Sequence, residues 1–148
     1  CERREGYRAA MRAAGVAIDE SLIVGNTFEA QDAAAAMAGL LDLPKPPTAV
    51  FAADDLMAAA ALEVIRQHGL RVPQDLAVVG FNDVTLARYL HLTTVRLSAQ
   101  DRGRLAIERL FARMKNPRLP WEGITVPTQL VVRESCGAGS EAVGRNRN

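Results

Sequence analysis

Two patterns of apolar and polar positions alternate along the chain. Apolar residues at helical spacing, rich in alanine, predict helices over 4–14, 29–41, 56–68 and 98–116, with a short helical turn over 85–89. Short unbroken apolar runs predict strands over 21–24, 48–53, 76–81 and 92–95, and two further short strands over 124–126 and 129–132. Proline and glycine separate most of these segments, so the element boundaries are well marked.

The order of these elements predicts the fold class. Helix and strand alternate with roughly the 30-residue period of a βαβ unit. Apolar strands without alternation are typical of parallel strands that are buried on both faces. We therefore expect an α/β fold with an open parallel sheet, helices on both faces and right-handed crossovers.

Polar residues follow three of the predicted strands, where ligands bind in open parallel sheets. The residues are Asn26, Thr27 and Phe28 after the first strand, Asp54 and Asp55 after the second, and Asn82 and Asp83 after the third. Amides and carboxylates beside an aromatic ring suit a neutral polyhydroxylated or heterocyclic ligand.

Each of these residues also has a structural interpretation. Asp55 is expected to be the N-cap of the helix that follows it, and Asp83 that of the short turn at 85–89. Asp54 and Asn82 fit a turn as well as a ligand contact. Phe28 fits the core as well as a stacking platform. The residue types alone leave these alternatives open.

The helix predicted over 56–68 has apolar residues on more than one side. Met57, Ala61 and Val64 form one stripe, and Ile65 belongs to a second. One sheet face would not cover both stripes. We expect either additional burial in the core or a contact with a second copy of the chain through these four residues.

Composition and charge exclude several classes of protein. The 148 residues predict one domain, and a formal net charge of +1 gives no electrostatic footprint for nucleic acid or an anionic membrane. No apolar run approaches the roughly 18 residues that span a bilayer. Cys1 and Cys136 suggest neither a disulfide framework nor a zinc cluster, which favours a reducing, cytoplasmic location.

Enzyme motifs are absent from the sequence. There is no phosphate-binding loop and no serine nucleophile elbow, and His68 and His91 are too isolated to form a metal-binding pair. We therefore expect a protein without catalytic activity, cofactor or metal.

Five segments, in order, resemble the lactose repressor (LacI-type) family of bacterial transcription regulators. They are RREGY at 3–7, PTAVFAADDLMA at 47–58, GLRVPQDLAVVGFND at 69–83, LTTV at 92–95 and LVVRES at 130–135. Each segment is short, but their order over residues 3–135 makes the resemblance specific.

This resemblance implies a periplasmic-binding-protein-like fold of type I, mostly its carboxyl-proximal lobe. Residues 1–95 with 124–136 would form that lobe, and 96–123 would be a crossover helix of the amino-proximal lobe. Residues 137–148 are expected to be a disordered tail. The helix-turn-helix of the family would lie outside this chain.

The resemblance also implies roles for single residues. Arg3 matches the family's effector-binding arginine, and Asp54 stands where a polar contact is often asparagine. Asn82 replaces an aspartate that usually bonds ligand hydroxyls. Thr27 or Phe28 would stand at the position of an aromatic that stacks on the ligand.

The implied function is the effector-sensing portion of a DNA-binding regulator. Its partners would be a small-molecule effector, such as a sugar, operator DNA through a domain outside this chain, and a second copy in a homodimer. No membrane partner is expected. The alternatives are a solute-binding protein of a sugar transporter and a small α/β enzyme.

Overall fold

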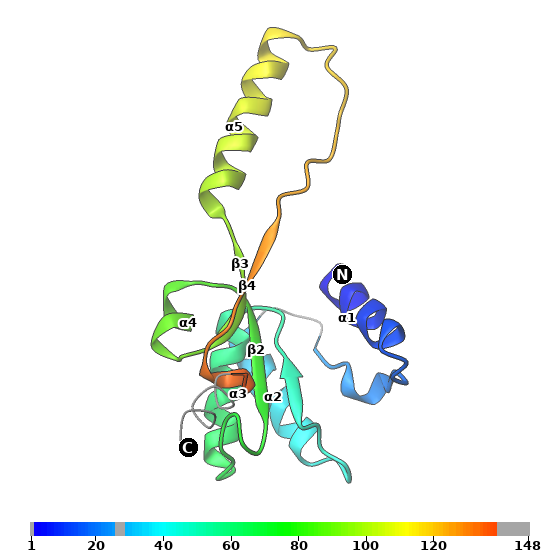
Figure 1. Ribbon diagram of the computed structural model, residues 1–148, viewed down its shortest axis with the longest axis vertical. Coiled ribbons are helices and arrows are strands. Elements are labelled where there is room, and N and C mark those ends of the chain that lie inside the picture. The colour runs from blue at the N-terminus through cyan, green and yellow to red at the C-terminus, as the bar shows by residue number, and fades with distance from the viewer. Residues whose placement is uncertain (1, 26–28, 139–148) are drawn as a thin grey trace, which may run out of the picture.

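The computed structural model describes residues 2–25 and 29–138, and Figure 1 shows an α/β body from which one long helix projects. The helices are α1 (Glu2–Ala13), α2 (Ala30–Leu41), α3 (Asp55–Gln67), α4 (Thr85–Tyr89) and α5 (Ala99–Lys115), with 3-10 helices η1 (Glu20–Leu22) and η2 (Glu134–Cys136). The strands are β1 (Ala49–Phe51), β2 (Ala77–Asn82), β3 (Thr93–Leu97) and β4 (Thr128–Val131).

The four strands form one open sheet in the order β1-β2-β3-β4. The first three are parallel, with Val50 opposite Val78 and Val79 opposite Thr93. β4 is antiparallel to β3, which places Arg96 opposite Gln129. The predicted α/β class is therefore confirmed, with a mostly parallel sheet.

The core lies where α3 packs on the sheet and α2 packs on α3. Met37 of α2, Ile65 of α3 and Val78 of β2 are fully buried in it. Gly80 follows Val78 on the same side of β2, because side chains alternate along a strand. The other side of β2 carries Phe81, and α1 reaches that side through Arg3.

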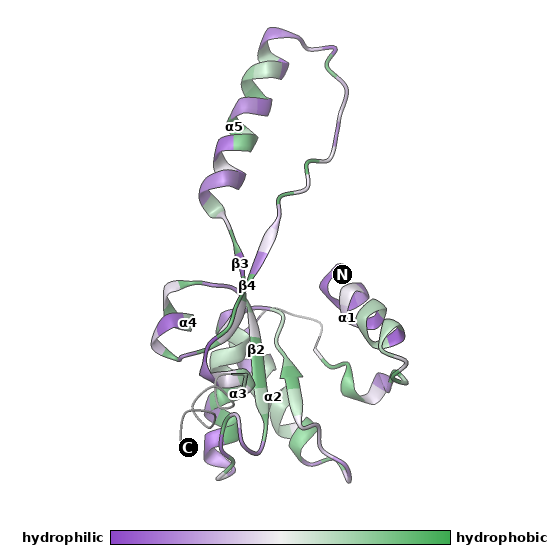
Figure 2. Cartoon of the chain, in the orientation of Figure 1, coloured by the Kyte–Doolittle hydropathy of each residue, from purple (hydrophilic) through white to green (hydrophobic). Residues whose placement is uncertain are grey.

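Helix α5 and the segment after it project away from this body (Figure 1). No residue of α5 is buried. Figure 2 shows apolar positions along the helix, and they include Ile107, Leu110 and Phe111 among the exposed residues. The returning segment folds back onto α5, where the Arg113 guanidinium lies 3.8 Å from the centre of the Trp121 ring.

Two predicted strands are wrong. Residues 20–22 form η1 because the Asp19 carboxylate accepts from the Ser21 backbone N–H and hydroxyl, an alternative to strand pairing. Residues 124–126 form no strand. β3 ends at Leu97, and the chain then diverges into α5, so these residues have no neighbouring strand to pair with.

Other sequence-based boundaries agree closely with the structure. α4 spans the predicted turn at 85–89. α5 begins as expected at Ser98, whose hydroxyl accepts from the Asp101 backbone N–H at 3.1 Å. The predicted tail lies outside the described residues from position 139 onward.

Candidate functional site

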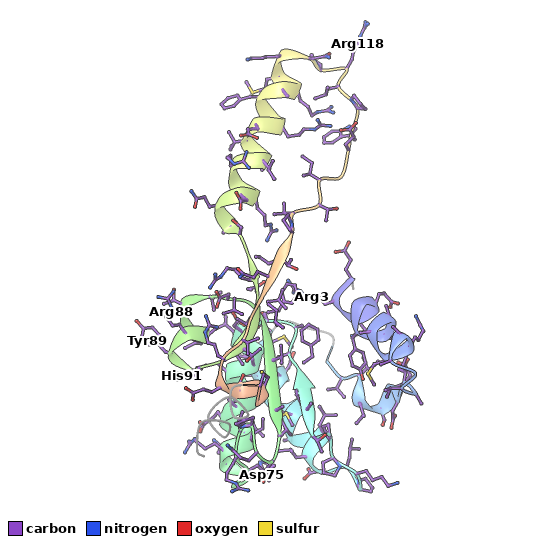
Figure 3. All side chains as sticks on the ribbon, viewed as in Figure 1. Arg3, Asp75, Arg88, Tyr89, His91 and Arg118 are labelled. Atoms are coloured by element: carbon purple, nitrogen blue, oxygen red, sulfur yellow. The ribbon has the colours of Figure 1, made fainter. Side chains whose placement is uncertain are left out.

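The site lies at the carboxyl ends of β1 and β2, where α1 approaches the sheet (Figure 3). Arg3 reaches across from α1, and its Nη2 donates to Asn82 Oδ1 over 3.4 Å. The same guanidinium lies 4.1 Å from the centre of the Phe81 ring. Phe51 meets Phe81 edge to face at a centroid distance of 6.3 Å. A cation, an amide and two aromatic rings thus share one edge of the sheet.

A cavity of about 450 Å³ adjoins Arg3, between α1, α2 and β1. Its walls are mainly apolar, with Tyr7, Met37, Phe51 and Met57 among them. A largely apolar wall with a few polar groups at fixed places binds ligands that have both an apolar face and hydrogen-bonding groups.

Asp54 combines a capping role with a place at this edge. It is the N-cap of α3, and its Oδ1 accepts from the Met57 backbone N–H at 2.7 Å. The side chain is part-buried, and one carboxylate oxygen satisfies the helix terminus. A ligand contact would use the remaining acceptor capacity of the carboxylate.

The prediction that Asp55 caps α3 is wrong, since the preceding residue is the cap. Asp55 is 1% exposed and points toward the sheet. Its Oδ2 accepts from the Val84 backbone N–H at 2.8 Å, and its Oδ1 accepts from the Thr94 hydroxyl at 2.6 Å. The buried carboxylate therefore joins three elements, α3, β3 and the turn after β2.

The prediction that Asp83 caps α4 is also wrong. The N-cap of α4 is Val84, which makes no side-chain capping bond. Asp83 is held instead by two arginines, with Arg96 Nε at 2.6 Å and Arg133 Nη2 at 2.7 Å. Burial would raise the pKa of Asp83, but hydrogen bonds from Arg133 and Arg96 outweigh it and lower the pKa. The charged carboxylate is the stable form here.

The turn that contains Asn82 and Asp83 has an unusual backbone. Their φ angles are 110° and 55°, in the left-handed region that residues other than glycine rarely adopt. Asn and Asp tolerate this region better than most residues do. The bonds to Asp83 and to the Val84 N–H hold the turn in this conformation.

The closing segment around η2 ties together the amino ends of β2 and β3. The buried Ser135 hydroxyl donates to the Val78 carbonyl at 2.6 Å and accepts from the Thr93 N–H at 2.8 Å. Arg133 Nη1 donates to the Leu92 carbonyl at 2.7 Å. Sequence reasoning placed Thr94, Arg133 and Ser135 in motifs but assigned them no role, and it passed over Arg96. For Thr94, Arg133 and Ser135 the signal was membership of those motifs, whereas Arg96 had only its position near the end of β3.

The predicted contact of α3 with a second copy is contradicted for three of its four residues. Ala61, Val64 and Ile65 are buried within this chain, where α2 packs against α3. Met57 is part-buried and lines the cavity described above. Additional core burial, the alternative, accounts for the wide apolar surface of this helix.

Some expectations concern residues that the structure does not describe. Thr27 and Phe28, expected near the ligand, lie outside residues 2–25 and 29–138, and so does Asn26. Within those two ranges, no group of His, Cys, Asp or Glu side chains is arranged to hold a metal ion. No helix there is both long and apolar enough to cross a membrane.

Comparison with known proteins gives a consistent set of relatives. The family described as periplasmic binding protein-like domain matches residues 1–136. The ribose operon repressor of Haemophilus influenzae is 37% identical over 135 residues, which cover 90% of this chain and 41% of the repressor. The HTH-type transcriptional regulator CelR of Thermobifida fusca is 41% identical over 140 residues, 90% of this chain and 40% of CelR.

A solved structure shows the same similarity in three dimensions. The complex of the transcriptional regulator CelR with cellobiose superposes with a TM-score of 0.85 at 42% identity. The match covers 90% of this chain and 42% of that one. The chain therefore spans about two fifths of the length of the relatives it matches.

Proposed function

The chain belongs to the periplasmic binding protein-like domain family of LacI-type transcription regulators, and on this premise we propose that it is the effector-sensing portion of such a regulator. The effector is a small molecule, a sugar or a related metabolite, that binds at the edge of the sheet beside Arg3. Operator DNA is bound by a domain outside this chain, and the proposal includes a cytoplasmic location because the regulator acts on DNA.

One observation carries this proposal. Arg3 and Asn82 are 79 positions apart, yet their side chains meet at the carboxyl ends of parallel strands. This is the place where open α/β sheets bind ligands. Both residues are among those that the resemblance to the family associates with the effector.

The chemistry of the site suits a sugar. The Asn82 amide offers both a donor and an acceptor, and Asp54 offers an acceptor, so adjacent hydroxyls can be bound in a fixed orientation. Phe51 and Phe81 provide apolar surface for the carbon face of the ring. The names of two relatives refer to ribose and cellobiose, which makes these sugars suitable probes.

The mechanism follows as a shift of populations. A ligand that binds one arrangement of the two lobes more tightly than the other moves the equilibrium toward the first. In our proposal residues 1–95 with 124–136 form the carboxyl-proximal lobe, and 96–123 reach into the other lobe. The exposed apolar side of α5 supports this division, because such a surface is normally covered by a partner.

We also propose that the chain forms a homodimer. Its contact surface differs from the apolar stripes of the helix at 56–68 that the sequence suggested. Leu56 and Tyr89 are 57% and 75% exposed, and Val84 is also exposed. Leu56 follows Asp55, whose carboxylate accepts from the Val84 N–H, and α3 packs against α4. Figure 3 shows Tyr89 pointing away from the body. We name Leu56, Val84 and Tyr89 the α3–α4 patch.

Binding of cellobiose and ribose by isothermal titration calorimetry tests the proposed function. Arg3→Met and Asn82→Gly should each weaken binding at least about tenfold, since each removes hydrogen bonds that involve a charged or amide group. Glycine is chosen at position 82 because it adopts the positive φ of this turn without strain. The matched control is Arg12→Met, which removes an arginine from the far end of α1. Equal affinity in all three variants would contradict the assignment of the site.

The other two functions have less support. The relatives compared above are transcription regulators, so a transporter's solute-binding protein is not favoured. The same relatives are not enzymes, and we propose a role without catalysis.

A further inference from the structure

Both strands that connect the body to α5 send an arginine to the same carboxylate. Arg96 belongs to β3, which runs directly into α5, and Arg133 follows β4, which returns from it. Arg96 Nε lies 2.6 Å from Asp83 Oδ2, and Arg133 Nη2 lies 2.7 Å from Asp83 Oδ1. We name Asp83, Arg96 and Arg133 the arginine clamp.

Solvent weakens the Asp83–Arg133 half of the clamp little, whereas the Arg96 side chain is 44% exposed. The Asp83 side chain is 8% exposed, and that of Arg133 is 16% exposed. Arg133 is itself oriented by its second bond, to the Leu92 carbonyl. Charge-assisted hydrogen bonds in such surroundings are short and directional. The clamp therefore fixes the position of Asp83 relative to both strands.

Asn82 adjoins the clamp directly. It shares the left-handed turn with Asp83, and it stands opposite Arg96 in the ladder between β2 and β3. On the other side of the turn, the buried Asp55 binds the Val84 N–H. Movement of the Asn82 amide would therefore disturb Asp83, and with it the strands that lead to α5.

We propose that Asp83 is a positioning residue: held by Arg96 and Arg133, it fixes the turn that presents Asn82 and ties that turn to the two strands that carry α5. The ligand side of this coupling rests on the proposed function, in which Asn82 contacts the effector. The clamp then transmits a shift at Asn82 to the strands that position α5. Because coupling between sites is reciprocal, a change in the α5 connection also affects Asn82.

Amide hydrogen exchange, measured residue by residue by NMR on the complete chain, tests the positioning role without any ligand. Arg96→Met should speed exchange at the Asp83 and Val84 amides about fivefold, the scale of one partly exposed ion pair. Arg133→Met should speed it at least about tenfold, because a more buried charged hydrogen bond is lost. Arg96→Lys should restore exchange close to the wild-type rate.

Coupling to α5 is tested by Asp83→Asn. Asparagine tolerates the left-handed backbone but lacks the charge that both arginines bind. Exchange should then quicken in the β3–β4 ladder, at Leu97 and Thr128, as well as in the turn. Arg66→Met is the matched control, since it removes an arginine paired with Glu63 on the exposed side of α3. It should leave both regions unchanged.

The outcomes separate this inference from the proposed function. Faster exchange in all amides, including those of Ile65 and Val78 in the core, would mean that the clamp contributes only general stability, and the inference would be wrong. Unchanged exchange in the turn would also overturn it. If the turn and ladder respond as expected but wild-type protein binds neither cellobiose nor ribose, the positioning role stands and the proposed effector site fails.

Discussion

At the residue scale, the buried Asp55 carboxylate explains why several neighbouring positions have the residues they do. It occupies the space above β2 at Gly80, where a Cβ would collide with Asp55 Oδ1 and with Leu92. It also uses the hydroxyl of Thr94. A buried carboxylate must have such partners, because leaving it unpaired costs several kcal/mol (roughly 3–5 in mutational studies). Segments 54–55, 80–83 and 92–95 therefore meet in one hydrogen-bonded group.

This packing makes Gly80 a sensitive position. Gly80→Ala should lower the free energy of unfolding by about 1–3 kcal/mol, the usual cost of overpacking a core. Urea unfolding followed by circular dichroism measures it. Gly39→Ala is the control, since no atom lies within 4 Å of its added Cβ and alanine favours the helix. Equal stability of the two variants would show that Asp55 and Leu92 can move aside.

At the element scale, Asp54 caps the start of α3 and is also a proposed ligand contact. A side-chain oxygen is needed there because the first backbone N–H groups of a helix lack partners within it. Asp54→Ala should therefore cost about 1 kcal/mol of stability. Asp54→Ser keeps a capping oxygen and should cost less, measured by thermal unfolding.

The same pair of variants separates capping from ligand binding. If the carboxylate contacts the effector, Asp54→Ser should weaken cellobiose or ribose binding even though the helix keeps its cap. If affinity in Asp54→Ser equals that of the wild type, Asp54 acts only as a cap, and the site is limited to Arg3 and Asn82 among the predicted residues that the structure describes.

At the scale of the whole molecule, two exposed apolar surfaces are the candidates for association with other protein surfaces. The α3–α4 patch lies on the body, whereas the apolar side of α5 lies on the projecting arm. The two surfaces have different expected partners in our proposal, a second copy for the patch and the amino-proximal lobe for α5. Substitutions can therefore test them independently.

The proposed homodimer gives a prediction at this scale. Tyr89→Ser with Leu56→Ser should raise the dimer dissociation constant at least about thirtyfold, since central aromatic residues dominate interface energies. Sedimentation equilibrium measures it. Val16→Ser, which changes an exposed apolar residue beyond the end of α1, is the control and should have no effect. An unchanged dissociation constant in the double variant would place the dimer contact elsewhere.

Local features of the sequence were enough to predict most of the fold. Periodicity and breaker residues located α2, α3, α4 and α5, because each of these helices has its own pattern and terminal signals. The three parallel strands were predictable from their apolar runs. For residues 21–24 and 124–126 the same kind of apolar run wrongly predicted strands. A strand also needs a neighbouring strand to pair with, and an apolar run alone does not supply one.

For the candidate site, too, the sequence was enough to predict some features, and others depended on the tertiary structure. The sequence by itself predicted that Asp54 and Asn82 would lie at the carboxyl ends of strands, because each follows an apolar run, and the resemblance to the family added Arg3 to the same site. Only the tertiary structure decided which of two adjacent aspartates caps α3, and that Asp83 binds arginines 13 and 50 positions away. It likewise decided that α2 covers Ala61, Val64 and Ile65. Hydrogen-bond partners and burial depend on which distant segments pack together, and no local pattern in the chain specifies that.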